Sequence, residues 1–281
     1  MDIQEFNRRI MARIRGLVES HKLVEMGEHV AVALSGGKDS VLTLHALADL
    51  REELDFELTA ITVDEGIEGY REEGVLAARE NARIRGVELI EKSFRDEFNF
   101  ELDDVLEGFR SPCIPCGVFR RWILNRTARE IGASKIATGH NMDDEVQSFI
   151  MSLARGDVRK FSKFGPKLQR IHPAMVPRIK PLWSTPERDV RLWAELNDVK
   201  FHSESCPYSS RSMRAGIRNF LNRIESENPA IKERIMKSFT VTFEPLVEDE
   251  GVGGCSVCGE PASGSKCKAC EFLEIIEGAD H

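Results

Sequence analysis

The sequence predicts an α/β protein: a doubly wound parallel sheet with an N-terminal helix, a helical C-terminal extension and a small four-cysteine module. Short runs rich in Val, Ile and Ala alternate with amphipathic segments at helical spacing as far as Gly156, which is typical of strand-helix-strand units. After Gly156 the strand signals weaken and Arg-rich helical segments follow. Two C-x2-C pairs then appear near the C-terminus. We therefore expect one α/β domain with an appendage on either side.

Four parts follow from these patterns. Residues 1–25 form the N-terminal helix, residues 26–160 the α/β domain, residues 161–245 the Arg-rich helical extension, and residues 250–281 the four-cysteine module. The N-terminal helix carries one apolar stripe, made by Ile3, Phe6, Ile10, Ile14, Leu17 and Val18. Because such a stripe packs on a domain more often than on a membrane, we expect it to cover the α/β core.

The first strand and helix surround a glycine-rich turn. Val30–Leu34 is short and apolar, which suits a buried parallel strand, and apolar residues from Val41 to Leu47 recur at helical spacing. The turn Ser-Gly-Gly-Lys-Asp-Ser, Ser35–Ser40, would point backbone N–H groups and the positive end of a helix dipole beyond the sheet. We therefore expect a phosphate-binding loop. It is not the P-loop G-x-x-x-x-G-K-[ST], because Asp39 follows Lys38.

The alternation continues beyond this unit. In chain order we expect a strand in 57–66, a helix in 71–85 closed by Gly86, a strand in 87–94, a loop feeding a helix in 111–133, and a strand, turn and helix in 134–157. Ligands of parallel sheets bind beyond the carboxyl ends of the strands. The loops after Leu34, Val63 and Thr138 should therefore face one crevice.

Composition and charge exclude several classes of protein. The chain has 41% hydrophobic and 31% charged residues, no apolar run that approaches a membrane span, and a start that alternates charged with apolar side chains, unlike a signal peptide. We expect a cytoplasmic protein with no membrane partner.

The net charge of −8 argues against indiscriminate nucleic-acid binding. Eight Lys or Arg and one Asp nevertheless lie between Arg155 and Lys180, either as a phosphate-binding surface or as a solvated loop.

The last four cysteines have the spacing of metal ligands. Cys255 and Cys258 form one C-x2-C pair, and Cys267 and Cys270 form a second after eight intervening residues. Two such pairs, with Gly and Ser between them, predict a tetrahedral structural Zn²⁺ site, so that this part would be a small zinc module. Disulfide bonds are the alternative, and a cytoplasmic location disfavours them.

Cys113, Cys116 and Cys206 form a second, incomplete set. A single C-x2-C pair is consistent with a redox pair, half of a second zinc site or coincidence. Three thiolates cannot complete a tetrahedral site, but three thiolates that hold a [4Fe-4S] cluster leave one iron open to a substrate or to sulfide. We expect His202, close to Cys206 in sequence, to be structural rather than a fourth ligand.

Several motifs together resemble those of a known family. They are SGGKDS, CIPCGVFRR, GHNMDDEVQS, the distant Cys206 and the four-cysteine module. In this order they resemble the tRNA 2-thiolation enzymes of the TtuA type, including the archaeal and eukaryotic wobble-uridine relatives, which are PP-loop ATP pyrophosphatases. The match covers most of Glu28 to Cys270 and is highly specific as a set. Family members typically open with another Cys and His zinc module, whereas this sequence opens with a helix. Either tRNA docking is weaker here or another element supplies that part of it.

The resemblance implies roles for individual residues. The ATP site would be formed by Ala33, Leu34, Ser35, Gly36, Gly37, Asp39, Ser40, Val63, Arg120 and Gly139. Cys113, Cys116 and Cys206 would hold the [4Fe-4S] cluster, and Asp144 matches a catalytic carboxylate. In chemical terms a carboxylate there could orient Mg²⁺ or move a proton, while Lys38 and Arg120 could neutralise phosphate charge. Helix capping is the simpler role for Asp143 and Asp144.

The implied reaction has two steps. ATP adenylates the C2 carbonyl oxygen of a uridine or ribothymidine in tRNA and releases pyrophosphate. Sulfur held at the open iron then attacks C2 and expels AMP. The target base must unstack, which favours a tRNA loop, and Arg211–Asn219 with the basic segment are candidate phosphate contacts. The sulfur donor would be a ubiquitin-like sulfur carrier protein or free sulfide, the resemblance implies a homodimer, and the sequence does not distinguish the modified position.

Three other functions stay open from the sequence. ATP activation could be combined with persulfide and disulfide chemistry of the three cysteines, without a cluster, if Arg120 and Arg121 keep a thiol pKa low. The same fold could act on a small molecule, as amidotransferase-like relatives do. The non-enzymatic alternative is a metal-bearing RNA-binding scaffold, which the intact SGGKDS loop disfavours.

Overall fold

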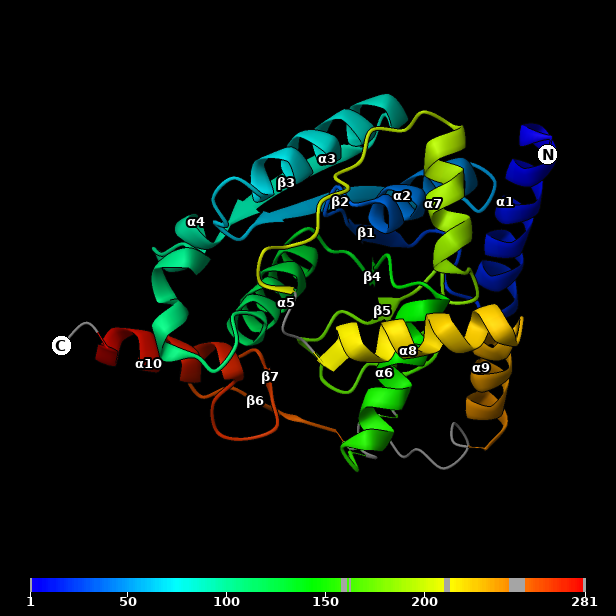
Figure 1. The fold of residues 1–281 in the computed structure, drawn as a ribbon. Coiled ribbons are helices and arrows are strands. Elements are labelled where there is room, and N and C mark those ends of the chain that lie inside the picture. Colours follow the sequence, from blue (N-terminus) through cyan, green and yellow to red (C-terminus); the bar gives the residue numbers. More distant parts are fainter. Residues whose placement is uncertain (1, 158–160, 162, 210–212, 243–250, 280–281) are drawn as a thin grey trace.

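A five-stranded parallel sheet forms the centre of the molecule (Figure 1). Its strands are β1 (His29–Ala33), β2 (Glu57–Asp64), β3 (Glu88–Ser93), β4 (Lys135–Ala137) and β5 (Arg178–Ile179), in the order β3-β2-β1-β4-β5. Every neighbouring pair of strands runs parallel. This computed structural model describes residues 2–157, 161, 163–209, 213–242 and 251–279. The predicted α/β class with a parallel sheet is confirmed.

The chain winds outward from the middle of the sheet in both directions. From β1, the strands β2 and β3 follow on one side, and β4 and β5 follow on the other. Val30 of β1 lies in register with Leu58 of β2 and Lys135 of β4. The strand order therefore reverses between β1 and β4. In open α/β sheets this is the point, beyond the carboxyl ends of the strands, where ligands bind.

In the described part of the chain, four helices share a core on one face of the sheet. They are α1 (Ile3–Ser20), α2 (Lys38–Leu50), α3 (Arg71–Arg85) and α7 (Glu187–Leu196), and Val30 and Val32 of β1 belong to the same core. The residues of α1 in this core are Phe6, Ile10, Ile14, Leu17 and Val18. Ile3, at the start of the helix, stays 44% exposed. The apolar stripe of the N-terminal helix thus packs on the α/β core as expected, except for its first residue.

Helix α5 (Cys113–Glu130) belongs to the core of the opposite face. The short α4 (Phe94–Phe98) and the 3-10 helix η1 (Leu102–Gly108) join it there. The four-cysteine module consists of a hairpin, β6 (Gly253–Gly254) and β7 (Pro261–Ala262), and helix α10 (Lys268–Ala279). Its buried side chains belong to the same core as α5. Figure 1 shows α10, in red, beside α5 and η1 at the C-terminal end of the molecule.

Helix α6 (Met142–Ala154) carries the C-terminal extension. Two helices, α8 (Met213–Glu227) and α9 (Ile231–Thr242), pack on α6 through Met142, Val146, Leu221 and Met236. Residues 197–209, here called the strap, lead from α7 across the carboxyl edge of the sheet toward α5 (Figure 1). Among the helices of the described ranges, none is long and apolar enough to cross a membrane.

The structure adds to the sequence-based expectation at two elements. Strand β5 was not expected, because a two-residue strand between Pro177 and Pro181 has no detectable periodicity. A loop feeding a helix was expected in 111–133, without a boundary between them; α5 begins at Cys113, so that Cys113 and Cys116 both lie in its first turn. Pro115 is compatible with this position because the first turn of a helix does not need its N–H group.

Ile14→Ala tests whether α1 belongs to the core. Ile14 is fully buried, so we expect the substitution to lower the free energy of unfolding by about 2–5 kcal/mol. Ile3→Ala in the same helix, where the side chain is 44% exposed, should change it by less than about 0.5 kcal/mol. Urea unfolding followed by circular dichroism compares the two. Equal losses would contradict the packing of α1.

Candidate functional site

The turn between β1 and α2 is shaped by two close backbone approaches. Gly36 has a φ of 82°, and a Cβ there would lie 1.9 Å from the carbonyl oxygen of Gly74 in α3. Gly139, in the turn after β4, would place a Cβ 2.7 Å from the amide nitrogen of Ser40. Only glycine is compatible with either position. The loop is therefore held between α3 and the turn after β4.

Hydroxyl groups fix the inner side of this loop. Ser40 Oγ donates to the carbonyl oxygen of Gly37 at 2.9 Å and accepts the backbone N–H of Ser35 at 3.1 Å. Gly37 is the N-cap of α2 and has no side chain that could satisfy the first N–H groups of the helix. These N–H groups are consequently available to a phosphate.

A buried ion pair supports the loop from the β2 side. The side chains of Arg71 and Glu65 are each 6% exposed, and Arg71 Nε lies 2.8 Å from Glu65 Oε2. The guanidinium also donates to the carbonyl oxygens of Ser35, at 2.6 Å, and Val63, at 2.8 Å. Glu65 Oε1 in turn lies 3.2 Å from Arg120 Nη1 of α5. One pair therefore connects the loop, β2 and α5.

Lys38 faces the cleft, but its charge is balanced inside the protein. Its Nζ donates to Asp39 Oδ2 at 2.8 Å and to Glu187 Oε1 at 3.0 Å. Burial lowers the pKa of Lys38, but the two carboxylates outweigh burial, so that the pKa is raised overall. Lys38 is therefore protonated and positively charged. A bound phosphate can replace Asp39 and Glu187 as the acceptor of its hydrogen bonds.

Asp144 combines helix capping with an unusual pKa. It closes a capping box with Asn141: its N–H donates to Asn141 Oδ1 at 3.0 Å, and the Asn141 N–H donates to Asp144 Oδ2 at 3.4 Å. Burial, reinforced by the carboxylate of Asp39, raises the pKa of Asp144 to about 6, although Arg214 opposes the shift. Capping occupies Oδ2, and Oδ1 lies 3.5 Å from Arg214 Nη1. The side chain keeps 29% exposure, so a ligand can reach Oδ1 by replacing this long contact.

The neighbouring residues have structural roles. Asp143 Oδ2 accepts the N–H of Glu187, the first residue of α7, at 2.7 Å, and its Oδ1 pairs with Lys232 of α9. Asp143 was expected to cap its own helix, α6. It instead accepts an N–H group at the start of α7. His140 Nδ1 lies 2.9 Å from Thr138 Oγ1. Burial and nearby cations lower the pKa of His140 to about 3, so a neutral ring fixes this turn.

One cleft of about 320 Å³ runs along the carboxyl edge of the sheet. On the side of α3 and α5 it is lined by Glu65, Tyr70, Arg71 and Arg120; in the middle by Ser35, Gly37, Lys38, Asp39, Asn141 and Asp144; and on the side of α7 and α8 by Glu187, Arg191 and Arg218. Phe201–Ser205 of the strap form a further wall that leads into Cys206. The loops after β1, β2 and β4 thus face one crevice, as expected.

The predicted nucleotide-site residues fall into two groups. Ser35, Gly37, Lys38, Asp39, Arg120 and Asp144 line the cleft. Ala33, Leu34, Gly36, Ser40, Val63 and Gly139 are not among its lining residues and instead shape the loop from behind. Sequence analysis missed Glu65, Tyr70, Arg71, Asn141, Glu187, Arg191, Arg218 and the strap wall. The Asn-x-x-Asp spacing of a capping box is a sequence signal for Asn141 alone.

Cys113 and Cys116 on α5 lie near Cys206 of the strap. Cys113 Sγ is 4.0 Å from the carbonyl oxygen of Tyr208, two residues beyond Cys206. Burial raises the pKa of Cys116 to about 12, with contributions from both other thiols, and burial also raises the pKa of Cys206. These mutual influences on the pKa values place the three thiols, carried by two elements, close to one another and to Arg120.

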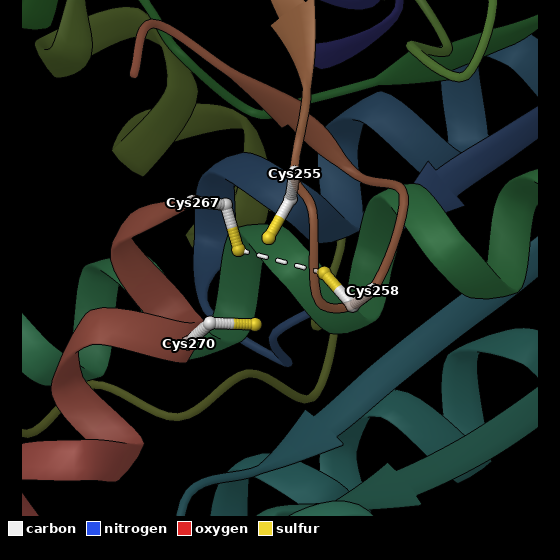
Figure 2. Close-up of side chains that lie close together, drawn as sticks. All are labelled: Cys255, Cys258, Cys267 and Cys270. Carbon is white, nitrogen blue, oxygen red and sulfur yellow. Dashed lines mark hydrogen bonds between the residues drawn. The ribbon is translucent and has the colours of Figure 1, made fainter. Parts of the chain in front are cut away.

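The four C-terminal cysteines converge on one point (Figure 2). The sulfur atoms of Cys255, Cys258, Cys267 and Cys270 all lie within 4.8 Å of one another, and those of Cys258 and Cys267 are 3.6 Å apart. Zinc–sulfur bonds of about 2.3 Å place tetrahedral sulfurs about 3.8 Å apart. Burial raises the pKa of Cys255, but backbone N–H groups outweigh it and lower the pKa to about 6. The group therefore fits one tetrahedral metal ion, and all seven cysteines are free of disulfide bonds.

Glu260 joins this module to α5. Asn125 Nδ2 donates to Glu260 Oε2 at 2.6 Å, and Arg129 Nη2 donates to Glu260 Oε1 at 2.5 Å. Glu260 is only 4% exposed, so these contacts compensate its buried charge. The helix that carries Cys113 and Cys116 is thereby attached to the module that carries the other four cysteines.

The basic segment between Arg155 and Lys180 is only partly a surface. Lys180 is 5% exposed and donates to Glu145 Oε1 at 2.7 Å. Its assignment as a phosphate contact is therefore wrong, because a run of charges in the sequence does not reveal a buried partner. Arg159, Lys160 and Arg211, which were also assigned to phosphate contacts, lie outside the described residues.

Two other basic positions have distinct surroundings. Arg214, in the predicted segment Arg211–Asn219, packs on α6 and donates to Ser148 Oγ at 2.9 Å. Burial and the charges of Arg121 and Arg120 lower the pKa of Arg178 to about 10. Because Arg120 also acts on the pKa of Cys116, these three guanidinium groups place positive charge beside the cysteines of α5.

Known proteins resemble this chain over most of its length. A family model described as a PP-loop domain matches residues 6–225. The tRNA 2-thiolation protein NcsA of Haloferax volcanii is 37% identical over 262 residues, which cover 88% of this chain and 82% of that protein. Cytoplasmic tRNA 2-thiolation protein 1 of Saccharomyces cerevisiae is 31% identical over 277 residues, which cover 94% of this chain and 77% of that protein.

A solved structure shows the same relationship. The U34-tRNA thiolase NcsA from Methanococcus maripaludis, determined with its [4Fe-4S] cluster, superposes with a TM-score of 0.85 at 34% identity. The superposition covers 97% of this chain and 88% of that one. The NMN synthetase of Francisella tularensis, at 15% identity and a TM-score of 0.50, shares the fold alone.

Arg71→Met tests the buried pair. The substitution leaves Glu65 with a buried charge that only Arg120 opposes, and breaking such a pair costs about 3–5 kcal/mol of the free energy of unfolding. Arg79→Met in the same helix removes an exposed pair with Glu91 and should cost less than about 1 kcal/mol. Thermal unfolding of both variants provides the comparison. A loss in R71M no larger than in R79M would show that the pair does not support the loop.

Asp144→Asn tests the raised pKa. A folded-state pKa of about 6, above the ordinary 3.8, means that ionised Asp144 destabilises the fold above pH 6 and that the penalty fades as the pH falls toward 4. D144N should therefore be more stable than the unchanged protein at pH 8, by about 1–2 kcal/mol, and the difference should shrink at pH 5. Thermal unfolding without divalent cations measures this. Asp143→Asn, which unpairs buried Lys232, should instead lose stability at pH 8, and the same loss in D144N would refute the assignment.

Proposed function

Because the chain belongs to the NcsA/TtuA-type family of tRNA 2-thiolation proteins with a PP-loop domain, we propose that it uses ATP to replace the C2 oxygen of a tRNA uridine by sulfur. One observation carries the proposal. The phosphate loop and Asp144 line the same cleft as Arg120, which follows Cys116 by one turn of α5. Activation by ATP and delivery of sulfur can then act on one bound base without its release.

In the first step the C2 carbonyl oxygen attacks the α-phosphorus of ATP. An oxygen–phosphorus bond forms, the bond from the α-phosphorus to the bridging oxygen breaks, and diphosphate leaves with that electron pair. The N–H groups at the start of α2, together with Lys38 and Arg120, stabilise the charge on the phosphates. Lys38 exchanges the carboxylates of Asp39 and Glu187 for phosphate oxygens as ATP binds.

Mg²⁺ is the cation that suits the carboxylates of this cleft. Asp39 and Asp144 both line it, and they lie close enough that Asp39 raises the pKa of Asp144. A divalent cation between them would remove this repulsion, and Mg²⁺ binds one or two carboxylates together with phosphate oxygens. We therefore propose that these two residues hold Mg²⁺ and so orient the phosphates for attack.

In the second step sulfur replaces oxygen at C2. Hydrosulfide sulfur attacks C2, the C2–oxygen bond breaks, AMP leaves with the former carbonyl oxygen, and the sulfur loses its proton. When bound to Cys113, Cys116 and Cys206, a [4Fe-4S] cluster supplies an iron with an open coordination position that can present sulfur. The contribution of the protein is to hold the three thiolates on α5 and the strap, next to the cleft wall formed by Phe201–Ser205.

Zn²⁺ is the metal that we propose for the four-cysteine module. Four converging thiols form the donor set of a closed structural zinc site. Such a site leaves no open position for chemistry, so its role is to fold the module. Through Glu260 the folded module holds α5, and with it Cys113 and Cys116.

The substrate and the cellular location that we propose are based on the related tRNA 2-thiolation proteins. We propose that tRNA binds with the target uridine unstacked into the cleft and with neighbouring phosphates near Arg121 and Arg178. Since the NcsA neighbour is named a U34-tRNA thiolase, we take the wobble uridine as the target. The name of the yeast relative supports a cytoplasmic location. A homodimer and a ubiquitin-like sulfur carrier protein stay predictions.

An anaerobic reaction tests the proposed activity. Iron-reconstituted protein, ATP, Mg²⁺, sulfide and unmodified tRNA should yield 2-thiouridine, which nucleoside mass spectrometry after digestion and mapping locates. Cys206→Ala and Asp144→Ala should each lower the yield at least about 100-fold, whereas Cys258→Ala should act only through stability. If no thionucleoside forms with sulfide or with an added sulfur carrier, although cluster, ATP and tRNA binding are verified, the chain does not thiolate tRNA.

Metal analysis tests the assignment of the two cysteine sets. Cys258→Ser should remove zinc and leave the iron content, whereas Cys113→Ser should remove iron and leave the zinc content, because the two sets lie on different elements. Inductively coupled plasma mass spectrometry of anaerobically prepared protein measures both metals. Loss of iron in C258S with zinc retained would reverse the assignment.

A further inference from the structure

On the side of α7 and α8 the cleft adjoins a second cavity of about 550 Å³. This cavity is bounded by the first residues of α6 and α7 and by helices α8 and α9. Glu187, Arg191 and Arg218 line both cavities, so the two share one wall. The thiolation chemistry proposed above leaves the second cavity without a role.

Two cations of the shared wall make no close polar contact in the described part of the chain. Arg191 and Arg218 are both exposed, and neither makes an ion pair or a side-chain hydrogen bond with any residue that the structure describes. Glu187 lies on the same wall, but its carboxylate already accepts a hydrogen bond from Lys38. Burial raises the pKa of Glu187, but Lys38 and the two arginines outweigh it and lower the pKa. The other carboxylates of the second cavity also have partners, since Asp143 pairs with Lys232 and Glu225 accepts the N–H of Lys232. Two exposed guanidinium groups beside compensated carboxylates are suited to an anion with phosphate oxygens.

The two faces of the sheet separate these arginines from the cysteines. Arg191 lies on α7, which shares the core of one face with α2, whereas Cys116 and Arg120 lie on α5, in the core of the opposite face, called here the cysteine end. Lys38 of the phosphate loop contacts Glu187 of α7 on one side, and the Arg71–Glu65 pair connects the loop to α5 on the other. A base that receives sulfur must lie at the cysteine end. The arginines are therefore on the side of the phosphate loop opposite the base.

In-line displacement relates this separation to the reaction. The attacking oxygen and the leaving oxygen lie on opposite sides of the phosphorus in phosphoryl transfer. If the base attacks from the cysteine end, the leaving diphosphate departs toward α7 and α8. That direction leads to Arg191 and Arg218 and into the second cavity.

We propose that the second cavity is an exit site for inorganic diphosphate, held by Arg191 and Arg218 after it leaves the α-phosphorus. The inference rests on the proposed function, since ATP must be cleaved between its α and β phosphates. An RNA phosphate is the other candidate anion. It is disfavoured because phosphates next to the target base would lie at the cysteine end, near Arg121 and Arg178.

Calorimetric titration of the full-length, metal-loaded protein with magnesium diphosphate tests the inference. The double variant R191Q/R218Q should bind diphosphate at least about tenfold more weakly, because each lost contact is charge-assisted. Its affinity for AMP, which lacks the departing phosphates, should not change. Arg223→Gln is the matched control, since Arg223 lies on α8 but lines neither cavity, and it should leave diphosphate binding unaltered.

Several results would overturn the inference. Diphosphate affinity that is unchanged in R191Q/R218Q, or that falls equally in R223Q, would remove the two arginines from the site. A fall in tRNA affinity and in its salt dependence, with diphosphate binding intact, would assign them to RNA instead. The titration does not involve thiolation, so a failure to make 2-thiouridine while diphosphate binding depends on both arginines would count against the proposed function alone. Because both side chains are exposed, unchanged thermal unfolding verifies that the variants fold.

Discussion

The buried pair between Arg71 and Glu65 connects the phosphate loop to the helix that carries Cys113 and Cys116, the two sites of the proposed chemistry. Burying two charges is costly, and such a pair persists only when its other donors and acceptors are satisfied. Here they are: Arg71 donates to the loop at Ser35 and to β2 at Val63, while Glu65 accepts Arg120 of α5. Because these partners carry the phosphate loop and the helix of Cys116, one pair sets the distance between the nucleotide site and the cysteines.

The charged side chains that line the cleft near this pair interact with one another. Lys38 is paired with Asp39 and Glu187, and Asp39 is close enough to Asp144 to raise its pKa. A nucleotide with its cation can satisfy both sets together, because phosphate oxygens replace the carboxylates on Lys38 and the cation relieves the two aspartates. Repulsion between the carboxylates of Asp39 and Asp144 lowers the stability of the fold. Such perturbed carboxylates are common at functional sites.

Sequence analysis succeeded where the signal is local and failed where it depends on packing. Alternating apolar runs located β1 to β4, and Gly86, with a φ of 58°, ended α3 as predicted. Strand β5 is too short to have a period. Lys180 looked like a surface charge because only the fold brings Glu145 to it. The shared wall of Arg191 and Arg218 exists because α7 and α8 both pack against the start of α6, which no motif records.

The central claim is that ATP activates the very oxygen that sulfur replaces, within one cleft. Transfer RNA labelled with ¹⁸O at C2 of the target uridine tests it most directly, with AMP analysed by mass spectrometry after one anaerobic turnover. Adenylation of C2 predicts that the label appears in the phosphate of AMP, in proportion to the 2-thiouridine formed. If thiouridine forms while AMP carries no ¹⁸O and the label is lost to water, ATP does not activate that oxygen, and the mechanism is wrong.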